Sequence, residues 1–431
     1  MFSNKKNYIN KFILLSSYLI IILPFAQITG PFLTDLTISL CALSYLIIII
    51  IFNNNLHVNN NYLNILFVFW IFIFICAIVS DHKNLSVLPS STFFRFILFS
   101  FAAIFIIKNS KNFFKKFNIS LIIVLIILIF DGYFQFIYGK NIIGLEKLRP
   151  DRLSSFFHDE LILGSFLFKF LPLIIFLFYE NIQFKKIKYL NLLIIIFIIP
   201  LIFLSGERAA FFMSILFCII VMPFLFSFKN FILIFFSFSI LSLVVINSNT
   251  IVYDRYVNQL KDHLIKKKGE ELIYFPEHIG LFNSAYNNFL NNKFIGSGIK
   301  SFRETCKLNN SEYKNKIIKL KPKTDFCSTH PHNYYLQFLT ELGLVGFLFL
   351  IATFIFCIIK YFKSLLIHYF KHTVDKLLFK KYNILLCGFI TFLWPLTTSG
   401  NFFNNYNSSF IFLNLSFFLH IYNEYVFKSK K

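Results

Sequence analysis

The sequence contains little charge. Only 14% of its 431 residues are Asp, Glu, Lys or Arg, whereas soluble domains average about 25%. Hydrophobic residues make up 57% of the chain. Apolar runs of roughly twenty residues, the length that a helix needs to cross a bilayer, recur from end to end. These features exclude an ordinary soluble fold and predict an all-α, polytopic membrane protein.

Three further patterns are missing. The apolar runs are continuous and do not alternate with polar residues, which disfavours a transmembrane β-barrel. No internal repeat of about 20–50 residues is present, so the chain is not a solenoid. The first apolar segment, 11–30, is too long for a signal-peptide core and lacks an evident small-residue cleavage site, so we expect it to be a membrane span.

Acidic residues are also scarce: 20 Asp and Glu stand against 42 Lys and Arg, a net charge of +22. Such a charge can indicate nucleic-acid binding. Most of the lysines, however, lie in short loops between apolar runs, where basic residues set the orientation of membrane spans. We therefore expect membrane lipids and no nucleic acid as partners, and we predict no cofactor.

The apolar runs predict about twelve spans. The sequence Ser205-Gly206-Glu207-Arg208 interrupts one long apolar block and predicts a tight turn there. The predicted spans are 12–30, 32–52, 63–80, 92–107, 117–138, 161–179, 189–205, 208–228, 230–247, 334–360, 382–400 and 408–426.

Basic residues concentrate near both ends of the chain and in alternate loops, such as 108–116, 185–188 and 360–381. This bias predicts that both termini of the membrane protein lie in the cytoplasm. Segment 248–333 then lies outside, as the one loop large enough to form a subdomain. The predicted parts are an N-terminal membrane region (1–247), a periplasmic loop (248–333) and a C-terminal membrane region (334–431).

The cysteines agree with this topology. Cys306 and Cys327 both lie in the long outer loop, where an oxidising periplasm permits a disulfide. Such a bond closes a loop of about 22 residues and contributes roughly 3 kcal/mol in the chain-entropy model. The alternative is a pair of free thiols. The other five cysteines fall within predicted spans and are interpreted as small packing residues.

Arg208 begins a predicted span directly after the Ser-Gly-Glu turn. A guanidinium group matches two phosphate oxygens at once, so one interpretation is a phosphate clamp. The other is an ordinary helix-end arginine that pairs with Glu207 or reaches the interface.

A His330-Pro331-His332-Asn333 cluster precedes the span that begins at residue 334. Proline suits the entry to a helix. The positive end of the helix dipole keeps a nearby histidine neutral and attracts anions. The cluster therefore suggests a general base beside an anionic substrate, and the alternative is a set of ordinary interfacial residues. A metal pair is disfavoured, because only Asp325 is close enough in sequence to be a third ligand.

The stretch LRPDRLSSFFHDELILGSF, residues 148–166, is a similar polar entry to a span. It contains Arg152, followed by His158, Asp159 and Glu160. Glu160 suits an arginine or a sugar hydroxyl as a partner, and it also suits the first turn of any helix. Gly343 and Gly346 are interpreted as structural residues that allow close helix packing.

Together these residues resemble a known family. His332-Asn333, nine residues, Gly343, two residues and Gly346 resemble the His-Asn-x9-Gly-x-x-Gly signature of the O-antigen ligases and related polysaccharide polymerases. SGERAA resembles their Ser-Arg-Ala motif, and FIGSGIKSF, residues 294–302, resembles the Gly-x-Gly turn late in their large periplasmic loop.

The resemblance implies a GT-C-type, metal-independent, inverting glycosyltransferase whose donor is a glycan on undecaprenyl diphosphate. The acceptor is lipid A-core in a ligase and another lipid-linked glycan in a polymerase. His332 is then the catalytic histidine and Arg208 binds the diphosphate, with Asn333, His330, Arg152 and Glu160 as further substrate-binding candidates.

The ligases also use an arginine in the large loop. At the matching place, before LFNSAYNNF, this chain has Glu277-His278 instead. The candidates for that role are Arg255, Arg303 and His278.

A polysaccharide transporter is the third interpretation. It favours charges near the middle of spans, where Lys169 is the main candidate. Most charges gather at the outer ends of the spans instead, which favours a transferase.

Overall fold

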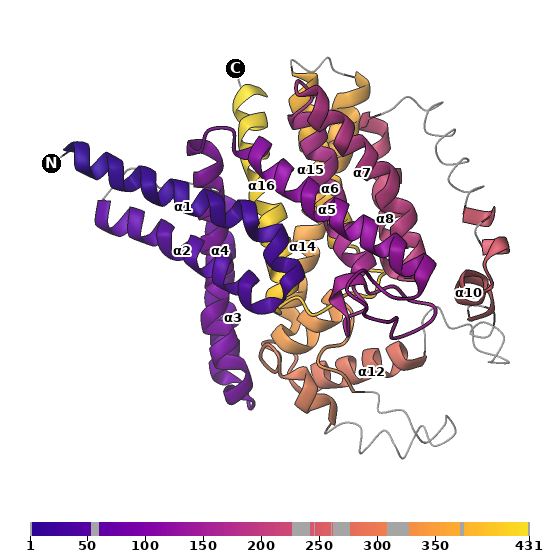
Figure 1. Cartoon of the computed structure of the whole chain (residues 1–431). Helices are drawn as coiled ribbons and strands as arrows, with labels where there is room; N and C mark the ends of the chain where they lie inside the picture. The colour runs from indigo at the N-terminus through magenta and orange to yellow at the C-terminus, as the bar shows by residue number, and fades with distance from the viewer. Residues whose placement is uncertain are drawn as a thin grey trace.

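The computed structural model describes residues 2–52, 60–225, 242–244, 246–259, 261, 276–307, 327–370 and 375–429, and every regular element in these ranges is a helix (Figure 1). The long helices are α1 (Phe2–Thr29), α2 (Pro31–Phe52), α3 (Asn61–Val79), α4 (Lys83–Asn109), α5 (Phe113–Tyr138), α6 (Leu163–Glu180), α7 (Lys185–Leu204), α8 (Arg208–Leu225), α12 (Pro276–Asn291), α14 (Tyr334–Phe370), α15 (Lys376–Phe392) and α16 (Asn405–Ser429). Short helical turns occupy Ser155–Phe157, α10 (Thr250–Tyr253) and Asp254–Asn258.

Nine of the described helices, α1 to α8 and α14, are long and apolar enough to cross a membrane. The prediction of an all-helical, multi-pass membrane protein is therefore confirmed. The predicted span 230–247 lies almost wholly outside the described residues. Helices α15 and α16 occupy the places of the last two predicted spans but are not among the nine. The total of about twelve spans and the GT-C-type fold stay predictions.

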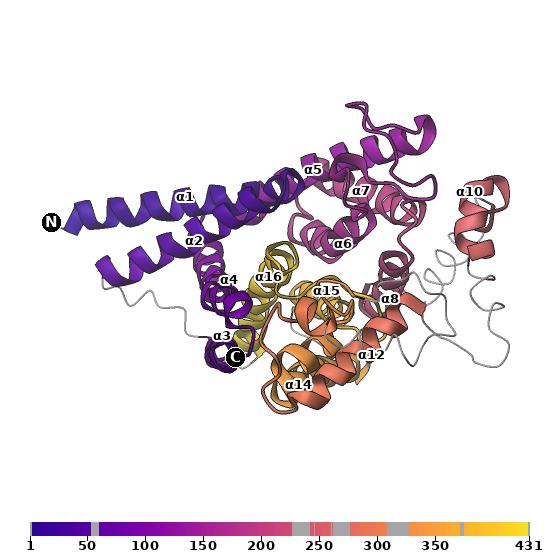
Figure 2. The ribbon, with the colours of Figure 1, turned by 90° about the horizontal axis from the view of Figure 1, so that it is seen from below.

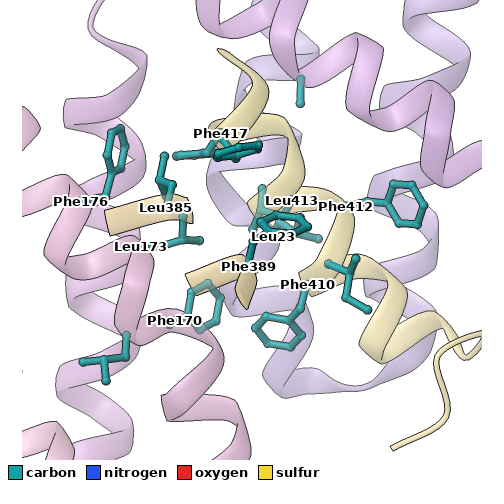
Figure 3. Packing of buried hydrophobic residues seen from close by; sticks show 14 of the residues in the cluster. Leu23, Phe170, Leu173, Phe176, Leu385, Phe389, Phe410, Phe412, Leu413 and Phe417 are labelled. Atoms are coloured by element: carbon teal, nitrogen blue, oxygen red, sulfur yellow. The ribbon is translucent and has the colours of Figure 1, made fainter. Parts of the chain in front are cut away.

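Helix α16 lies inside the bundle, packed against α15, α4 and α2 (Figure 2). Its face toward α6 carries Phe410 and Phe417, which contact Phe170 and Phe176 (Figure 3). Several of its polar residues are buried as well, including Asn414. A helix surrounded by other helices needs less hydrophobic character than one that faces lipid, which explains its lower hydropathy.

The predicted span 382–400 is wrong at its C-terminal end. Helix α15 stops at Phe392, and the chain continues without regular helix until α16 begins at Asn405. Pro395 and Gly400 lie in this connection. Both residue types end helices, because proline removes a backbone donor and glycine favours turns. Segment 393–404 thus becomes a loop beside the start of α14, where Asn333 contacts Pro395 and Thr397.

Helix α14 is longer than the predicted span 334–360 and is broken at Gly343, whose φ is +65° and ψ is −162°. The turn around Gly296 docks into this break. The Ser297 N–H donates to the Thr340 carbonyl at 3.0 Å, and the Leu344 N–H donates to the Lys293 carbonyl at 2.8 Å. These bonds satisfy backbone groups that the break leaves without helical partners.

The break is possible only with glycine. The backbone angles of Gly343 belong to a region that is essentially restricted to glycine. A Cβ atom there would also lie 2.4 Å from the Phe294 carbonyl oxygen. The sequence suggested only a packing role for Gly343, and the structure gives it a second role. It allows the late part of the long loop to bind directly to α14.

Other contacts hold the long loop at the same end of the bundle. The Ser86 hydroxyl donates to the Ile299 carbonyl at 2.8 Å, and the Ser80 hydroxyl donates to the Ser297 carbonyl. A disulfide joins Cys306 to Cys327, the pairing that the sequence predicted. Helix α12 packs against α14, on the side of the molecule opposite to the C-terminus (Figure 1).

Candidate active site

Two groups of charged or titratable side chains lie in the loops and helix ends around Arg208 and His332. The first is an arginine cluster in which Arg255 is the most enclosed member. Its Nε donates to the Gly206 carbonyl at 3.0 Å, and its Nη1 donates to Asp151 at 3.1 Å and to Gln259 at 2.9 Å. Arg208 donates to the same Gln259 oxygen at 3.3 Å. Two residues far apart in the sequence, Arg208 and Arg255, are thus joined through one amide. The cluster consists of Arg149, Arg152, Arg208 and Arg255.

The cluster carries more positive than negative charge. Burial and the neighbouring Arg208 lower the pKa of Arg255 to about 10, although Asp151 opposes this effect. Burial disfavours the charged form of Asp151, but the hydrogen bond from Gln259 and the charges of Arg255 and Arg149 outweigh it and hold its pKa below the usual value. Arg255 therefore stays charged at neutral pH, and a cleft beside it is also lined by Lys147 and Arg152. Such a cleft attracts anions.

One interpretation of the sequence paired Glu207 with Arg208, and in the structure the hydrogen bonds that we observe to the Glu207 carboxylate come from α6. Its two carboxylate oxygens accept hydrogen bonds from the N–H groups of Gly164 and Ser165, at 2.6 and 3.2 Å. These donors belong to the first turn of α6, so Glu207, which lies in the turn before α8, caps the start of α6. Burial raises its pKa to about 7 against the opposing effects of Arg152 and the two N–H groups. The acid is thus only partly ionised near neutral pH.

The second group is a histidine cluster formed by His278, His330 and His332. The ring centroids of His330 and His332 lie 4.2 Å apart, and those of His278 and His332 lie 5.6 Å apart with the rings nearly perpendicular. His278 comes from α12, whereas the other two precede α14. His332 Nε2 lies 3.3 Å from the Ser328 hydroxyl. The docked loop thus brings a third imidazole to the two that the sequence places together.

The surroundings of these rings favour the neutral form. Burial, and then the proximity of His278, lower the pKa of His332, against the opposing effect of the Ser399 backbone. Burial, and then His332, lower the pKa of His330 to about 3. Both imidazoles are therefore neutral at pH 7, the state in which a histidine can accept a proton.

Asn333 connects the histidine cluster to segment 393–404. Its side-chain oxygen accepts hydrogen bonds from the N–H groups of Tyr335 and Leu336, which caps α14. Its side-chain nitrogen donates to the carbonyls of Pro395 and Thr397 at 2.8 and 3.1 Å. Both ends of the amide are thus used within the protein, which gives Asn333 a clear structural role.

The other candidates from the sequence lie elsewhere. Glu160 is exposed, its backbone forms two hydrogen bonds, and its charge acts on Tyr406. Arg303 lies near Lys300 rather than in the arginine cluster. His278 faces His332 and not the arginines. Among the three candidates for the second arginine role, Arg255 is the one that the structure joins to Arg208.

Metal ligands are a separate question. Across the described ranges, no three His, Cys, Asp or Glu side chains are grouped so as to hold a metal ion. Asp325, which the sequence suggested as a third ligand, lies outside these ranges.

Part of the chain is similar to a known protein family. Residues 192–351 match the family model described as O-antigen ligase. This match supports the resemblance of the chain to the O-antigen ligase and polymerase-related superfamily. The matched region runs from α7 to α14 and includes Arg208, the long loop and His332. No curated protein matches the chain. Together with the nine apolar helices, the match supports a multi-pass bacterial membrane protein and, at a coarse level, an enzyme of the glycan-transferring kind.

Some site residues were missed in the sequence. Gln259 bridges the two central arginines, but no motif surrounds it. Segment 393–404 supports the histidine cluster through the Ser399 N–H, which donates to the His332 carbonyl at 2.8 Å. The run Pro395 to Gly400, rich in residues that end helices, was the signal that could have identified this loop.

Proposed function

We propose that this protein is an O-antigen ligase-like glycosyltransferase. It transfers a glycan from undecaprenyl diphosphate to an acceptor hydroxyl, that of lipid A-core, at the periplasmic face of the inner membrane. The observation that carries the proposal is the presence of two sites within the matched family region: half-buried, neutral His332 and the linked arginines Arg208 and Arg255.

The chemistry follows from these groups. His332 accepts the proton of the acceptor hydroxyl, and the acceptor oxygen forms a bond to the sugar C1 from the face opposite the diphosphate. The bond between C1 and the diphosphate oxygen breaks, and undecaprenyl diphosphate leaves. Arg208 and Arg255 stabilise the negative charge that grows on the leaving group. Inversion at C1 results, without a need for a metal ion.

Other residues have supporting roles in this proposal. Arg152 lies beside the cleft and adds positive charge for the donor, while its Nη2 is held by the Leu161 carbonyl at 2.7 Å. His330 and Asn333 keep His332 in place. Segment 248–333 is the periplasmic loop between membrane regions 1–247 and 334–431, with both termini in the cytoplasm. Consistent with this, the two chain ends lie away from α12 in Figure 1.

A polymerase that joins lipid-linked repeat units is the second candidate, because the same groups suit any hydroxyl acceptor. Mass spectrometry of lipid-linked glycans from a strain that lacks the gene distinguishes a ligase from a polymerase. Long chains that stay on undecaprenyl diphosphate, with none on lipid A-core, identify a ligase. Single repeat units on undecaprenyl diphosphate identify a polymerase. Unchanged glycans in both pools contradict the proposal and favour a transporter.

A further inference from the structure

Lys169 is a charged residue inside a membrane-crossing helix, α6, and the proposed reaction does not use it. An ammonium group within the bilayer is costly and is retained mainly where it binds something. Lys169 lies four residues after Ser165, whose N–H contacts Glu207. At about 1.5 Å per residue this places the Lys169 backbone roughly 6 Å along α6 from Ser165, away from the start of the helix.

The protein satisfies this ammonium only in part. Nζ donates to the Asn407 side-chain oxygen at 2.6 Å. It also lies over the rings of Tyr406 and Phe410, with 4.3 and 5.0 Å to their centroids. An ammonium has three N–H donors, so one oxygen and two aromatic faces leave donor capacity for a ligand.

The acidic residue that acts on Lys169 is already engaged by other hydrogen bonds. Among the described residues, Glu207 is the acid that acts on Lys169 electrostatically. Both Glu207 oxygens already accept hydrogen bonds from the first turn of α6. This carboxylate thus leaves Lys169 with donor capacity that an anionic ligand can meet.

The aromatic residues beside Lys169 are packed against α6. Phe410 packs against Phe166 and Phe170, with ring centroids 5.5 and 4.9 Å apart, and Figure 3 shows the apolar side chains that continue the α6–α16 contact. The side chain of Lys169 itself is half-buried. Beside it, the Tyr406 hydroxyl is buried and has no hydrogen-bond partner in the described part of the chain. An ammonium and a hydroxyl donor thus lie together above a closed apolar contact.

We propose that Lys169 Nζ and Tyr406 Oη bind the phosphate of a polyprenyl phosphate that adjoins its lipid tail. This inference rests on the proposed function, which supplies the lipid class. In a lipid-linked diphosphate, the phosphate next to the tail lies deeper than the one next to the sugar. The deeper phosphate matches Lys169, whose side chain leans toward the N-terminal end of α6, and the outer one matches the arginine cluster.

The test is binding without transfer. Undecaprenyl monophosphate, which has no sugar and one phosphate, is titrated by native mass spectrometry against the purified protein in lipid nanodiscs. Lys169→Met weakens binding roughly tenfold or more, because a charge-assisted hydrogen bond is lost, and Tyr406→Phe weakens it less. Lys169→Arg retains most of the affinity.

Lys360→Met is the matched control. Lys360 also donates to one oxygen, the Tyr422 hydroxyl at 3.3 Å, and lies over the rings of Phe356 and Tyr422, but it belongs to α14. This variant keeps wild-type affinity. Unchanged affinity in Lys169→Met overturns the proposal. If that variant does not fold, unchanged affinity in Tyr406→Phe overturns it.

Two further arms separate the alternatives. If phosphatidylglycerol competes as well as undecaprenyl monophosphate, the subsite takes any anionic lipid and the proposal is wrong. The transfer reaction is decided separately by His332→Ala. Loss of lipid binding in Lys169→Met with normal transfer in His332→Ala would reject the catalytic assignment and keep the subsite, and the reverse pattern would reject the subsite alone.

Discussion

At the scale of single residues, His332 is unusual because two other imidazoles surround it. A base must be neutral to accept a proton, so activity falls as pH decreases through the pKa of His332. Burial and His278 both lower that pKa, which moves the loss of activity to pH values below about 6.5, the ordinary histidine value.

The effect of His278 on the pKa of His332 gives the first prediction. His278→Phe keeps an aromatic ring beside His332 but removes the like charge, so the pKa of His332 rises. The acid limb of the pH–rate profile then moves to higher pH, by a fraction of a unit. Transfer rates measured between about pH 5 and 8 check this. A limb that stays in place or moves to lower pH would show that His278 does not act on the base.

Arg208 gives the second prediction. Arg208→Lys keeps the charge but loses the planar fork that matches two phosphate oxygens. The loss of a charge-assisted hydrogen bond is worth about 1.5–3 kcal/mol, so transfer slows roughly tenfold to a hundredfold. Arg149→Lys is the control, because Arg149 is exposed and pairs with Asp151. Equal rates in the two variants would remove Arg208 from the diphosphate site.

At the scale of elements, the docking of the long loop on α14 depends on Gly343. The third prediction is that Gly343→Ala lowers the midpoint of thermal unfolding of the purified protein. Strain at these backbone angles costs about 1–3 kcal/mol, and the contact with Phe294 adds to it. Gly144→Ala serves as the control, since φ is +92° there but no atom lies within 4 Å of the added carbon. An equal shift in both variants would mean that loop docking is unimportant.

The disulfide gives the fourth prediction. Cys306→Ser removes a covalent closure worth roughly 3 kcal/mol in the chain-entropy model. We expect a lower unfolding midpoint and faster proteolysis of the long loop, while the transfer rate at low temperature changes little. Treatment of the wild type with a reductant should reproduce the effect. Strong loss of activity without loss of stability would assign the bond a role in the site instead.

Sequence reasoning performed differently for different elements. Long apolar runs determined α1 to α8 and α14, because a helix that faces lipid must be apolar along its length. The sequence prediction placed the end of α15 too late, because apolar residues such as Phe402 continue past Pro395. The break at Gly343 was also missed. Its cause is a turn some fifty residues earlier, and contacts between such distant segments leave no local periodic signal.

The candidate site was also predictable only in part. His330 and His332 are separated by one residue in the sequence, so their proximity was predictable. The contact of His278 with His332 and the pairing of Arg255 with Arg208 depend on how the long loop folds back. The sequence therefore offered three candidates for the second arginine and had no physical basis for a choice among them.

At the scale of the whole molecule, the proposal requires that the arginine and histidine clusters face the periplasm. Alkaline phosphatase is active only outside the cytoplasm, so fusions after Gly298 should be active and fusions after Lys186 or Lys428 inactive. A fluorescent protein that folds only in the cytoplasm should give the opposite pattern. Activity of the phosphatase fused after Lys428 would overturn the orientation.

The central claim is that His332 performs glycan transfer at this outer face. The most direct measurement is a glycan gel of a gene-deleted strain that carries the wild type, His332→Ala or His420→Ala. His420 is the matched control, a buried histidine of α16 that lies beside Glu424. We predict that His332→Ala reaches normal protein levels in the membrane and gives no polymer on the acceptor, whereas His420→Ala restores it. Normal polymer with His332→Ala would contradict the account.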